Sequence, residues 1–159
     1  MTHIVGMADM KVMADKRSVL VTYALGSCLG ISVYDPVAKV GGLLHVMLPS
    51  SSINSAKAAE NSLMFVDTGV PNLFHACYAA GAHRERLVVK VAGGAAVDSV
   101  NDFFSIGERN YVMLKKLFWK NGIMISAEDV GGTISRIMSI DIGNGQVVLK
   151  SSGKEWLLV

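Results

Sequence analysis

Short apolar runs, separated by polar residues or glycine, fill the first third of the chain. Their lengths, and the alternation of apolar and polar positions within them, predict β-strands. The runs cover residues 10–13, 19–22, 29–34 and 41–48. Asp35-Pro36 interrupts the third run, and Pro49 with the serines at 50–52 stops the fourth. We therefore expect four strands followed by a flexible, serine-rich loop.

Two later segments have the spacing of amphipathic helices. In the first, Asp67 or Thr68 can cap the helix, Pro71 suits its first turn, and Gly81 can end it. In the second, residues 107–121, apolar side chains recur on one stripe, and lysines gather toward the C-terminal end. We expect one helix in each segment.

The rest of the chain is β-rich. Apolar or alternating runs at residues 87–91, 123–128, 134–142 and 146–150 predict further strands. Gly143-Asn144-Gly145 suits a tight hairpin connection between the last two. Two helices against many short strands indicate a layered α/β or α+β sandwich.

Composition limits the class of protein. The chain has 159 residues, 51% of them hydrophobic, which suits one compact domain over residues 1–159. Its 15 basic and 13 acidic side chains nearly balance, so nothing favours nucleic acid or an anionic membrane surface. Every apolar run falls short of the roughly 18 residues that a membrane-spanning helix needs, and the first residues lack the pattern of a secretory signal. We expect a cytoplasmic protein without membrane insertion, whose two cysteines are free thiols.

Candidate chemistry lies in the turn Leu25-Gly26-Ser27-Cys28, between two predicted strands. A cysteine becomes an effective nucleophile when a neighbouring base takes its proton. His45, in the strand that follows, is a candidate general base and acid, and Thr22 is a candidate for orienting the imidazole ring. Adjacent strands lie about 4.8 Å apart, so the three side chains can meet if they share a face.

The same turn suggests two further properties of the site. It leaves the main-chain N–H groups of Ser27 and Cys28 without obvious strand partners, so these are candidates for an oxyanion hole. We also expect His45 to lower the pKa of Cys28 by stabilising the thiolate. Cys28 should then alkylate faster than Cys77 near neutral pH.

Each of the three residues also has a purely structural interpretation. A cysteine between apolar strands is typical of a buried core. A histidine flanked by Leu44 and Val46 is typical of a hydrogen-bonded structural residue, and threonine favours strands for its own reasons. The residues alone leave both interpretations open.

Other candidate sites are weaker. His75 and Cys77 point in different directions from a predicted helix, and no further ligands lie at the spacing of a zinc site, so we expect no metal. Gly93-Gly94 and Gly131-Gly132 lack the surroundings of a nucleotide-binding loop. They predict turns with unusual backbone angles, and we expect no cofactor.

Five segments in the same order resemble the chemoreceptor glutamine deamidase (CheD) family of bacterial chemotaxis, over nearly the whole chain. They are Leu25-Gly26-Ser27-Cys28, GLLHVMLP at 42–49, KVAGGA at 90–95, IGERN at 106–110 and EDVGG at 128–132. The resemblance implies that Cys28 is the nucleophile, His45 the general base and acid, and Thr22 the hydroxyl residue that orients His45. It also implies an α+β fold, a layered α/β/β sandwich similar to the cytotoxic necrotizing factor deamidases. The chain departs from many relatives at Ala96-Val97, near which they carry a bulkier methionine or phenylalanine.

The activity implied by the resemblance is hydrolysis of a protein amide. The substrate would be a glutamine side chain on the cytoplasmic helical domain of a methyl-accepting chemotaxis receptor. It would be converted to glutamate, with release of ammonia, through a thioester on the cysteine. Family members are also similar in binding the phosphatase CheC, and methyl-ester hydrolysis is a further activity of the family.

Two other functions compete with this interpretation. One is a binding module without catalysis that modulates a CheC-type phosphatase. The other is a generic cysteine peptidase, which is disfavoured because the local signatures of the papain and caspase families are absent.

Overall fold

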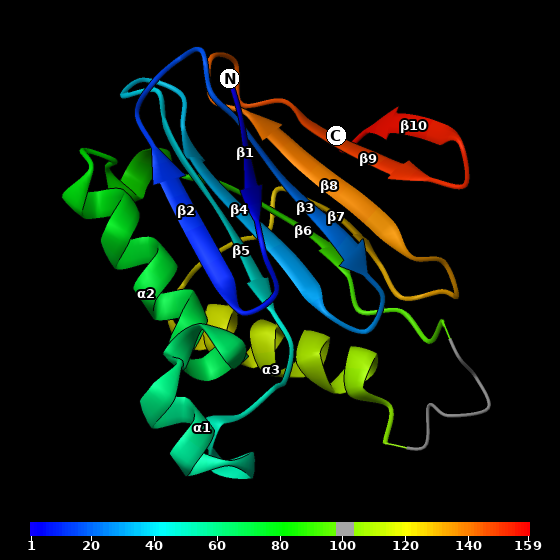
Figure 1. The fold of residues 1–159 in the computed structure, drawn as a ribbon. Coiled ribbons are helices and arrows are strands. Elements are labelled where there is room, and N and C mark those ends of the chain that lie inside the picture. The colour runs from blue at the N-terminus through cyan, green and yellow to red at the C-terminus, as the bar shows by residue number, and fades with distance from the viewer. Residues whose placement is uncertain (98–103) are drawn as a thin grey trace.

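Two β-sheets lie face to face, and helices cover the outer face of one of them (Figure 1). The computed structural model describes residues 1–97 and 104–159. Sheet A has the order β1 (Thr2–Val5), β3 (Val19–Leu25), β8 (Arg136–Asp141), β9 (Val147–Ser151), β10 (Lys154–Leu157). Sheet B has the order β2 (Asp9–Met13), β5 (Val40–Val46), β4 (Leu29–Asp35), β6 (Val88–Gly93), β7 (Ala127–Val130). The described helices are α1 (Ser55–Glu60), α2 (Val66–Ala79) and α3 (Ile106–Lys120), with 3-10 turns η1 (Ser51–Ile53), η2 (Ser62–Met64) and η3 (Arg84–Arg86).

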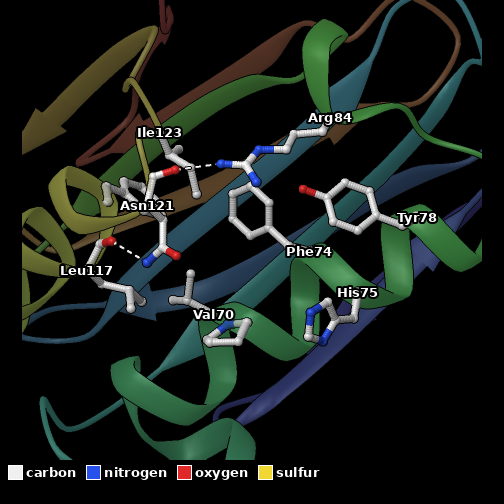
Figure 2. A pocket seen from close by; sticks show the side chains of 10 residues that line it. Val70, Phe74, His75, Tyr78, Arg84, Leu117, Asn121 and Ile123 are labelled. Carbon is white, nitrogen blue, oxygen red and sulfur yellow. Dashed lines mark hydrogen bonds between the residues drawn. The ribbon is translucent and has the colours of Figure 1, made fainter.

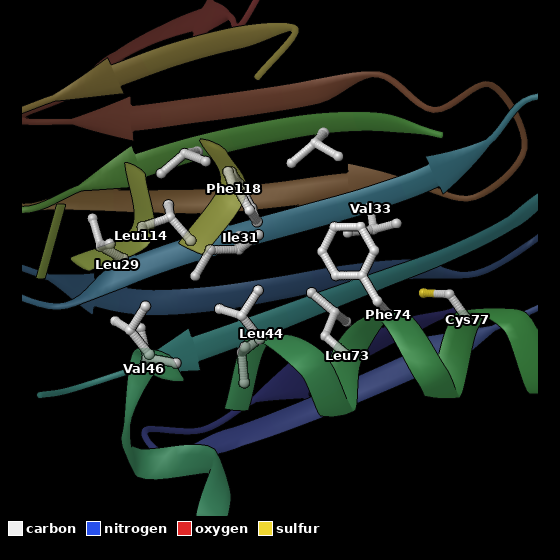
Figure 3. Close-up of a cluster of buried hydrophobic side chains, with 14 of the residues drawn as sticks. Leu29, Ile31, Val33, Leu44, Val46, Leu73, Phe74, Cys77, Leu114 and Phe118 are labelled. Carbon is white, nitrogen blue, oxygen red and sulfur yellow. The ribbon is translucent and has the colours of Figure 1, made fainter. Parts of the chain in front are cut away.

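The apolar core forms two layers, one on each face of sheet B. Between sheet B and the helices, side chains of β4 and β5 meet Leu73, Phe74 and Cys77 of α2 and Leu114 and Phe118 of α3 (Figure 3). Between the two sheets, a second cluster joins side chains of both sheets; it includes Leu20, Leu25, Leu43, Met138, Ile140 and Leu149. The order of layers is therefore helices, sheet B, sheet A, and the predicted α+β class is confirmed.

The central strands β4 and β5 are buried along their whole length. Alternate residues of each strand face the helices and the other sheet, so both faces are apolar. This double burial explains why the two strands are visible in the sequence as nearly continuous hydrophobic runs. Strand β8, by contrast, alternates between buried and half-buried positions, because only one of its faces packs on the core.

Strand prediction succeeded for most strands and failed for the two edge strands of sheet A. β2 to β6, β8 and β9 lie close to the predicted runs, and the hairpin after β8 contains Gly145 at φ 75°. The run predicted at 123–128 instead forms β7 at Ala127–Val130, where it pairs in parallel with β6. β1 and β10 were not predicted. Both are edge strands of four residues with mostly exposed or half-buried side chains, so their sequences carry little apolar alternation.

The predicted start of α2 was wrong by two or three residues. The helix begins at Val66, with Phe65 as its N-cap, and neither Asp67 nor Thr68 serves as the cap. The Val66 N–H donates to Leu48 O over 2.9 Å, so contact with the end of β5 determines where the helix begins. Pro71 therefore lies beyond the first turn, inside the helix.

The serine stretch is also more ordered than predicted. Ser51 begins η1, and Asp67 accepts hydrogen bonds from its N–H over 2.9 Å and from its hydroxyl over 2.8 Å. The short helix α1 follows, capped by the side chain of Asn54. None of its residues is buried, so it lacks the amphipathic pattern by which a helix is found in a sequence.

Candidate active site

His45 lies at the interface between the two sheets. Its neighbours in β5, Leu44 and Val46, face the helices, whereas His45 and Leu43 point the other way, toward sheet A. The His45 side chain is completely buried. Because successive side chains of a strand alternate between its faces, the register of β5 is enough to place this imidazole in the intersheet layer.

Thr22 meets His45 from the opposite sheet, so the expectation that it reaches His45 along one face of adjacent strands was wrong. The Thr22 hydroxyl donates to Val5 O over 2.7 Å, and its oxygen lies 2.7 Å from His45 Nδ1. A hydroxyl has one hydrogen, and a carbonyl oxygen can only accept. His45 Nδ1–H must therefore donate to Thr22, which assigns the proton to Nδ1 and leaves the lone pair on Nε2.

Cys28 lies on the same face of sheet B as His45. It precedes β4 directly and packs, half-buried, against the intersheet cluster. In the pairing of β4 with β5, Gly30 is opposite His45, so Cys28, two residues earlier, is a diagonal neighbour of the histidine. Gly30 has no side chain to intervene. The structure thus brings together all three residues that the sequence predicted.

Burial controls the protonation of the pair. It lowers the pKa of His45 to about 4, because a charged imidazolium is disfavoured away from water. Burial also raises the pKa of the Cys28 thiol, and a main-chain hydrogen bond at Cys28 opposes this only in part. We expected His45 to lower the pKa of Cys28, but the pKa is raised, and burial is the cause. At neutral pH the site holds a neutral thiol beside a neutral imidazole.

Loop 26–28, which carries the cysteine, is held through its carbonyl groups. Gly26 O accepts from Ala95 N over 2.8 Å, and Cys28 O accepts from Gly94 N over 2.9 Å. Ser27 O accepts from the side chain of Asn110 over 2.9 Å. The C=O and N–H groups of one peptide point in opposite directions, so the N–H groups of Ser27 and Cys28 face away from these partners.

Close backbone packing at Gly93 fixes the path of this loop. Gly93 has φ 111°, and a Cβ atom there would lie 2.2 Å from Cys28 O. Gly94 has φ 62°. The predicted unusual backbone angles at Gly93-Gly94 are confirmed, and their role is contact with the cysteine loop.

Sequence reasoning missed a buried ion pair beside the loop. Arg136, only 4% exposed, lies 2.9 Å from Asp129 Oδ1 and donates to Gly131 O over 3.0 Å and to Gly93 O over 3.4 Å. Trp156 donates to the other carboxylate oxygen of Asp129 over 2.9 Å. The network joins the two sheets next to Gly93. The motif at 128–132 was visible in the sequence, but its partner Arg136 gave no separate signal.

Asn110 was also missed as a residue with a part in the site. It lies in α3, is completely buried, and donates from Nδ2 to Ser27 O and, over 3.1 Å, to Met47 O. Within the described residues, the buried side-chain atoms without a hydrogen-bond partner are His45 Nε2 and Asn110 Oδ1. Unsatisfied buried polar atoms are rare in proteins. Both of these belong to the cluster around Cys28.

Two of the hollows near the helices bear on the position of the site. A cleft of 410 Å³ is lined by Gly94 and Ala95, whose N–H groups bind loop 26–28. Glu108 and Tyr111 also line it, and the Tyr111 hydroxyl donates to Glu128. A separate hollow of 150 Å³ between α2 and α3 is lined by side chains that include Phe74 and Arg84 (Figure 2). Neither hollow is lined by Thr22, Cys28 or His45.

No group of three His, Cys, Asp or Glu side chains in residues 1–97 and 104–159 could hold a metal ion. Over the same residues, no helix is long and apolar enough to cross a membrane.

The geometry defines a class of α+β protein with a half-buried cysteine beside a histidine whose ring is oriented by a hydroxyl. The CheD family, described as "CheD chemotactic sensory transduction", matches residues 47–151. The chain belongs to the CheD family of chemotaxis proteins.

Curated relatives support membership of the CheD family, because the matches cover nearly their full length. A protein of Syntrophus aciditrophicus (strain SB), named probable chemoreceptor glutamine deamidase CheD 1, is 49% identical over 94% of each chain. A probable chemoreceptor glutamine deamidase CheD of Solibacter usitatus (strain Ellin6076) is 49% identical over 98% of this chain and 92% of its own. One of Syntrophotalea carbinolica is 43% identical over 96% of each chain. The match covering 98% of the chain includes the segment with Thr22, Cys28 and His45.

Proposed function

We propose that this protein deamidates glutamine side chains of methyl-accepting chemotaxis receptors, in the cytoplasm, with Cys28 as nucleophile, His45 as general base and acid, and Thr22 as the residue that orients His45. The relatives named as chemoreceptor glutamine deamidases support the substrate class. The observation that carries the proposal is the buried His45 Nε2, which has no partner among the described residues while Nδ1 donates to Thr22. Nε2 makes no hydrogen bond to Cys28 Sγ or to any other described group, and the β4–β5 register makes Cys28 a diagonal neighbour of His45. A free lone pair at this place can serve as a general base once the thiol approaches it.

The first half of the reaction forms a thioester. His45 Nε2 takes the Cys28 proton as the sulfur attacks the carbonyl carbon of the glutamine carboxamide. Because the thiol and the imidazole are both neutral at rest, the proton moves with the attack instead of beforehand. The N–H groups of Ser27 and Cys28 are the donors proposed for the oxyanion. His45 then returns the proton to the nitrogen, the C–N bond breaks, and ammonia leaves.

The second half restores the enzyme. Water enters where ammonia left, and His45 Nε2 accepts one of its protons as the oxygen attacks the thioester carbon. The C–S bond breaks, and the sulfur recovers its proton from His45. The sum is carboxamide plus water giving carboxylic acid plus ammonia.

Incubation with receptor cytoplasmic fragments tests the proposal directly. Wild-type protein should add about one dalton at specific glutamines, the change for NH₂ replaced by OH, as measured by peptide mass spectrometry. Cys28→Ala should abolish the change. Equal conversion by Cys28→Ala would show that Cys28 is not the nucleophile.

The adjoining cleft supplies a surface for the receptor segment. We infer that Glu108 and Tyr111 of α3 form part of the surface on which the receptor segment lies, because they line the same cleft as Gly94 and Ala95, which are hydrogen-bonded to the cysteine loop. Glu108→Ala should raise KM for receptor fragments more than it lowers kcat. We also propose that the layered sandwich is similar in fold to the cytotoxic necrotizing factor deamidases.

Binding to a CheC-type phosphatase remains a separate proposal, as a partner role that can coexist with catalysis. A binding module without catalysis predicts that wild-type protein leaves receptor fragments unchanged. It also predicts that Cys28→Ala keeps both phosphatase binding and phosphatase stimulation. A buried, unpartnered imidazole nitrogen is not needed for binding alone, which is why the structure favours the enzyme.

A further inference from the structure

Asn110 hydrogen-bonds the main chain close to both members of the proposed catalytic pair through one amide group. Its Nδ2 donates to Ser27 O over 2.9 Å, beside Cys28, and to Met47 O over 3.1 Å, two residues after His45. Both acceptors are main-chain carbonyls. The orientation of the amide is therefore fixed, because only the NH₂ group can serve two carbonyl oxygens.

We propose that Asn110 is a positioning residue that sets the separation and orientation of Cys28 and His45. The inference rests on the proposed function for its place in catalysis, but the two hydrogen bonds exist independently of it. Of the three carbonyls of loop 26–28, those of Gly26 and Cys28 are held by main-chain N–H groups. Ser27 O is held by the side chain of Asn110, which also donates to Met47 O, just after the end of β5.

The helix that carries Asn110 is itself held close to the loop. Gly107, one turn earlier in α3, packs so tightly that a Cβ atom there would lie 2.6 Å from both Gly94 O and Ala95 O. Gly94 and Ala95 are the residues whose N–H groups bind Cys28 O and Gly26 O. The start of α3, the end of β6 and loop 26–28 therefore form one close-packed unit, which leaves Asn110 little freedom to move.

The energetics of Asn110 also indicate a role beyond packing. The residue is fully buried, yet its Oδ1 has no partner among the described residues. A buried acceptor without a hydrogen bond is unfavourable. An apolar side chain would avoid that cost but would supply no donor to Ser27 O and Met47 O.

A double-mutant cycle with a small alkylating agent tests the proposal without any receptor. Alkylation of Cys28 by iodoacetamide is followed by peptide mass spectrometry in wild type, Asn110→Ala, His45→Ala and the double variant. If Asn110 acts through the pairing, Asn110→Ala should slow alkylation roughly tenfold in the presence of His45. In the His45→Ala background it should change the rate less than about twofold.

Two results would overturn the proposal. One is an Asn110→Ala rate equal to that of wild type. The other is the same slowing with and without His45, which would mean that Asn110 only shapes the loop. Asn72→Ala is the matched control: Asn72 is a helical asparagine whose Nδ2 donates to Ser62 Oγ over 2.8 Å, away from the site. It should leave the rate unchanged. If Asn110→Ala unfolds, Asn110→Ser, which keeps one donor, replaces it in the same cycle.

Receptor fragments give the second readout. Asn110→Ala should lower kcat for deamidation with KM little changed, since a positioning residue does not touch the substrate. If the cycle shows coupling but wild-type protein deamidates no receptor fragment, the positioning role stands and the proposed function fails. If deamidation occurs but the cycle shows no coupling, the proposed function stands and the positioning role fails.

Discussion

The hydroxyl of Thr22 has one hydrogen, and Val5 O receives it. This single constraint decides the tautomer of His45 and the nitrogen at which proton transfer takes place. Burial in the intersheet layer then keeps both His45 and Cys28 neutral. At the scale of single residues, the pair holds a neutral thiol and a neutral imidazole, which suits the general-base role that we propose and not a preformed thiolate and imidazolium.

Replacement of Thr22 tests the role of its hydroxyl. Thr22→Val removes the acceptor for His45 Nδ1–H, so the ring loses its fixed tautomer, and kcat should fall roughly 10- to 100-fold. Thr22→Ser keeps the hydroxyl and should retain most of the activity. A Thr22→Val enzyme with the kcat of wild type would exclude the orienting role.

The two thiols should differ in reactivity. Burial raises the pKa of Cys77 to about 12, and its side chain is completely buried, whereas Cys28 is half-buried. Iodoacetamide should therefore modify Cys28 faster than Cys77 in the folded protein. Because the pKa of Cys28 is also raised, its rate should still be increasing above pH 8.5. Equal rates at the two thiols, or a plateau below neutral pH, would contradict this assignment.

At the scale of elements, the end of β6 and the start of α3 determine where loop 26–28 lies. β6 supplies Gly93 and leads into Gly94 and Ala95, and α3 supplies Gly107 and Asn110. The β4–β5 pairing sets the register of Cys28 against His45. A substitution in any of these elements should displace Cys28 before it unfolds the protein.

Alanine substitutions at two glycines distinguish the effect of contact with loop 26–28 from the effect of backbone strain. Gly93 and Gly81 have nearly the same φ, 111° and 113°, but a Cβ atom at Gly81 would meet nothing within 4 Å. Both alanine variants should lose about 1–2 kcal/mol from the left-handed backbone. Gly93→Ala should lose more stability in urea unfolding and reduce deamidation at least tenfold, because its Cβ displaces Cys28 O. Similar behaviour of the two variants would mean that strain alone matters.

At the scale of the whole molecule, the packing of two sheets under a layer of helices creates the buried space that the site needs. His45 owes its burial to sheet A, and Arg136 with Asp129 and Trp156 ties the sheets together beside Gly93. The environment of the imidazole is therefore a property of the assembled sandwich.

Burial of His45 should make stability depend on pH. The folded pKa of about 4 lies below the unfolded value of about 6.5. The unfolded chain therefore binds the proton first, and stability is full above pH 6.5 and falls as pH drops toward 4. Between pH 7 and 4.5 the loss should be about 2 kcal/mol in urea unfolding.

His45→Gln is the control for this window, since glutamine does not titrate. Its stability should change less between the same two pH values, whatever its absolute stability. Asp9 lies opposite His45 in the pairing of β2 with β5. Its carboxylate forms an ion pair with Lys11, with Oδ2 3.2 Å from Lys11 Nζ. Burial raises the pKa of Asp35, but hydrogen bonds from Arg86 and three main-chain N–H groups outweigh this and hold it below its usual range, so its contribution is lost only at lower pH. An equal pH dependence in both proteins would rule out His45 as the source.

Much of the fold follows from local pattern. The two-sided burial of β4 and β5 gave continuous apolar runs, and the stripe on α3 gave a helix that begins within one residue of the prediction. The edge strands β1 and β10 and the exposed helix α1 were missed, because their side chains are mostly exposed or half-buried and leave no strong pattern. The start of α2 depended on Leu48, a contact that the local sequence does not contain.

For the candidate site, strand periodicity alone predicted that His45 shares a face with Leu43, and the turn at Gly26 marked Cys28 as a candidate nucleophile. The sequence by itself thus determined which side of its strand His45 occupies, because alternation along a strand is a local property. The tertiary structure decided that Thr22, in the other sheet, meets it. Only the tertiary structure decided how they behave. Desolvation between two sheets sets the sign of the pKa shifts, and hydrogen bonds from Asn110 and Gly94 to the cysteine loop join residues more than 60 positions apart.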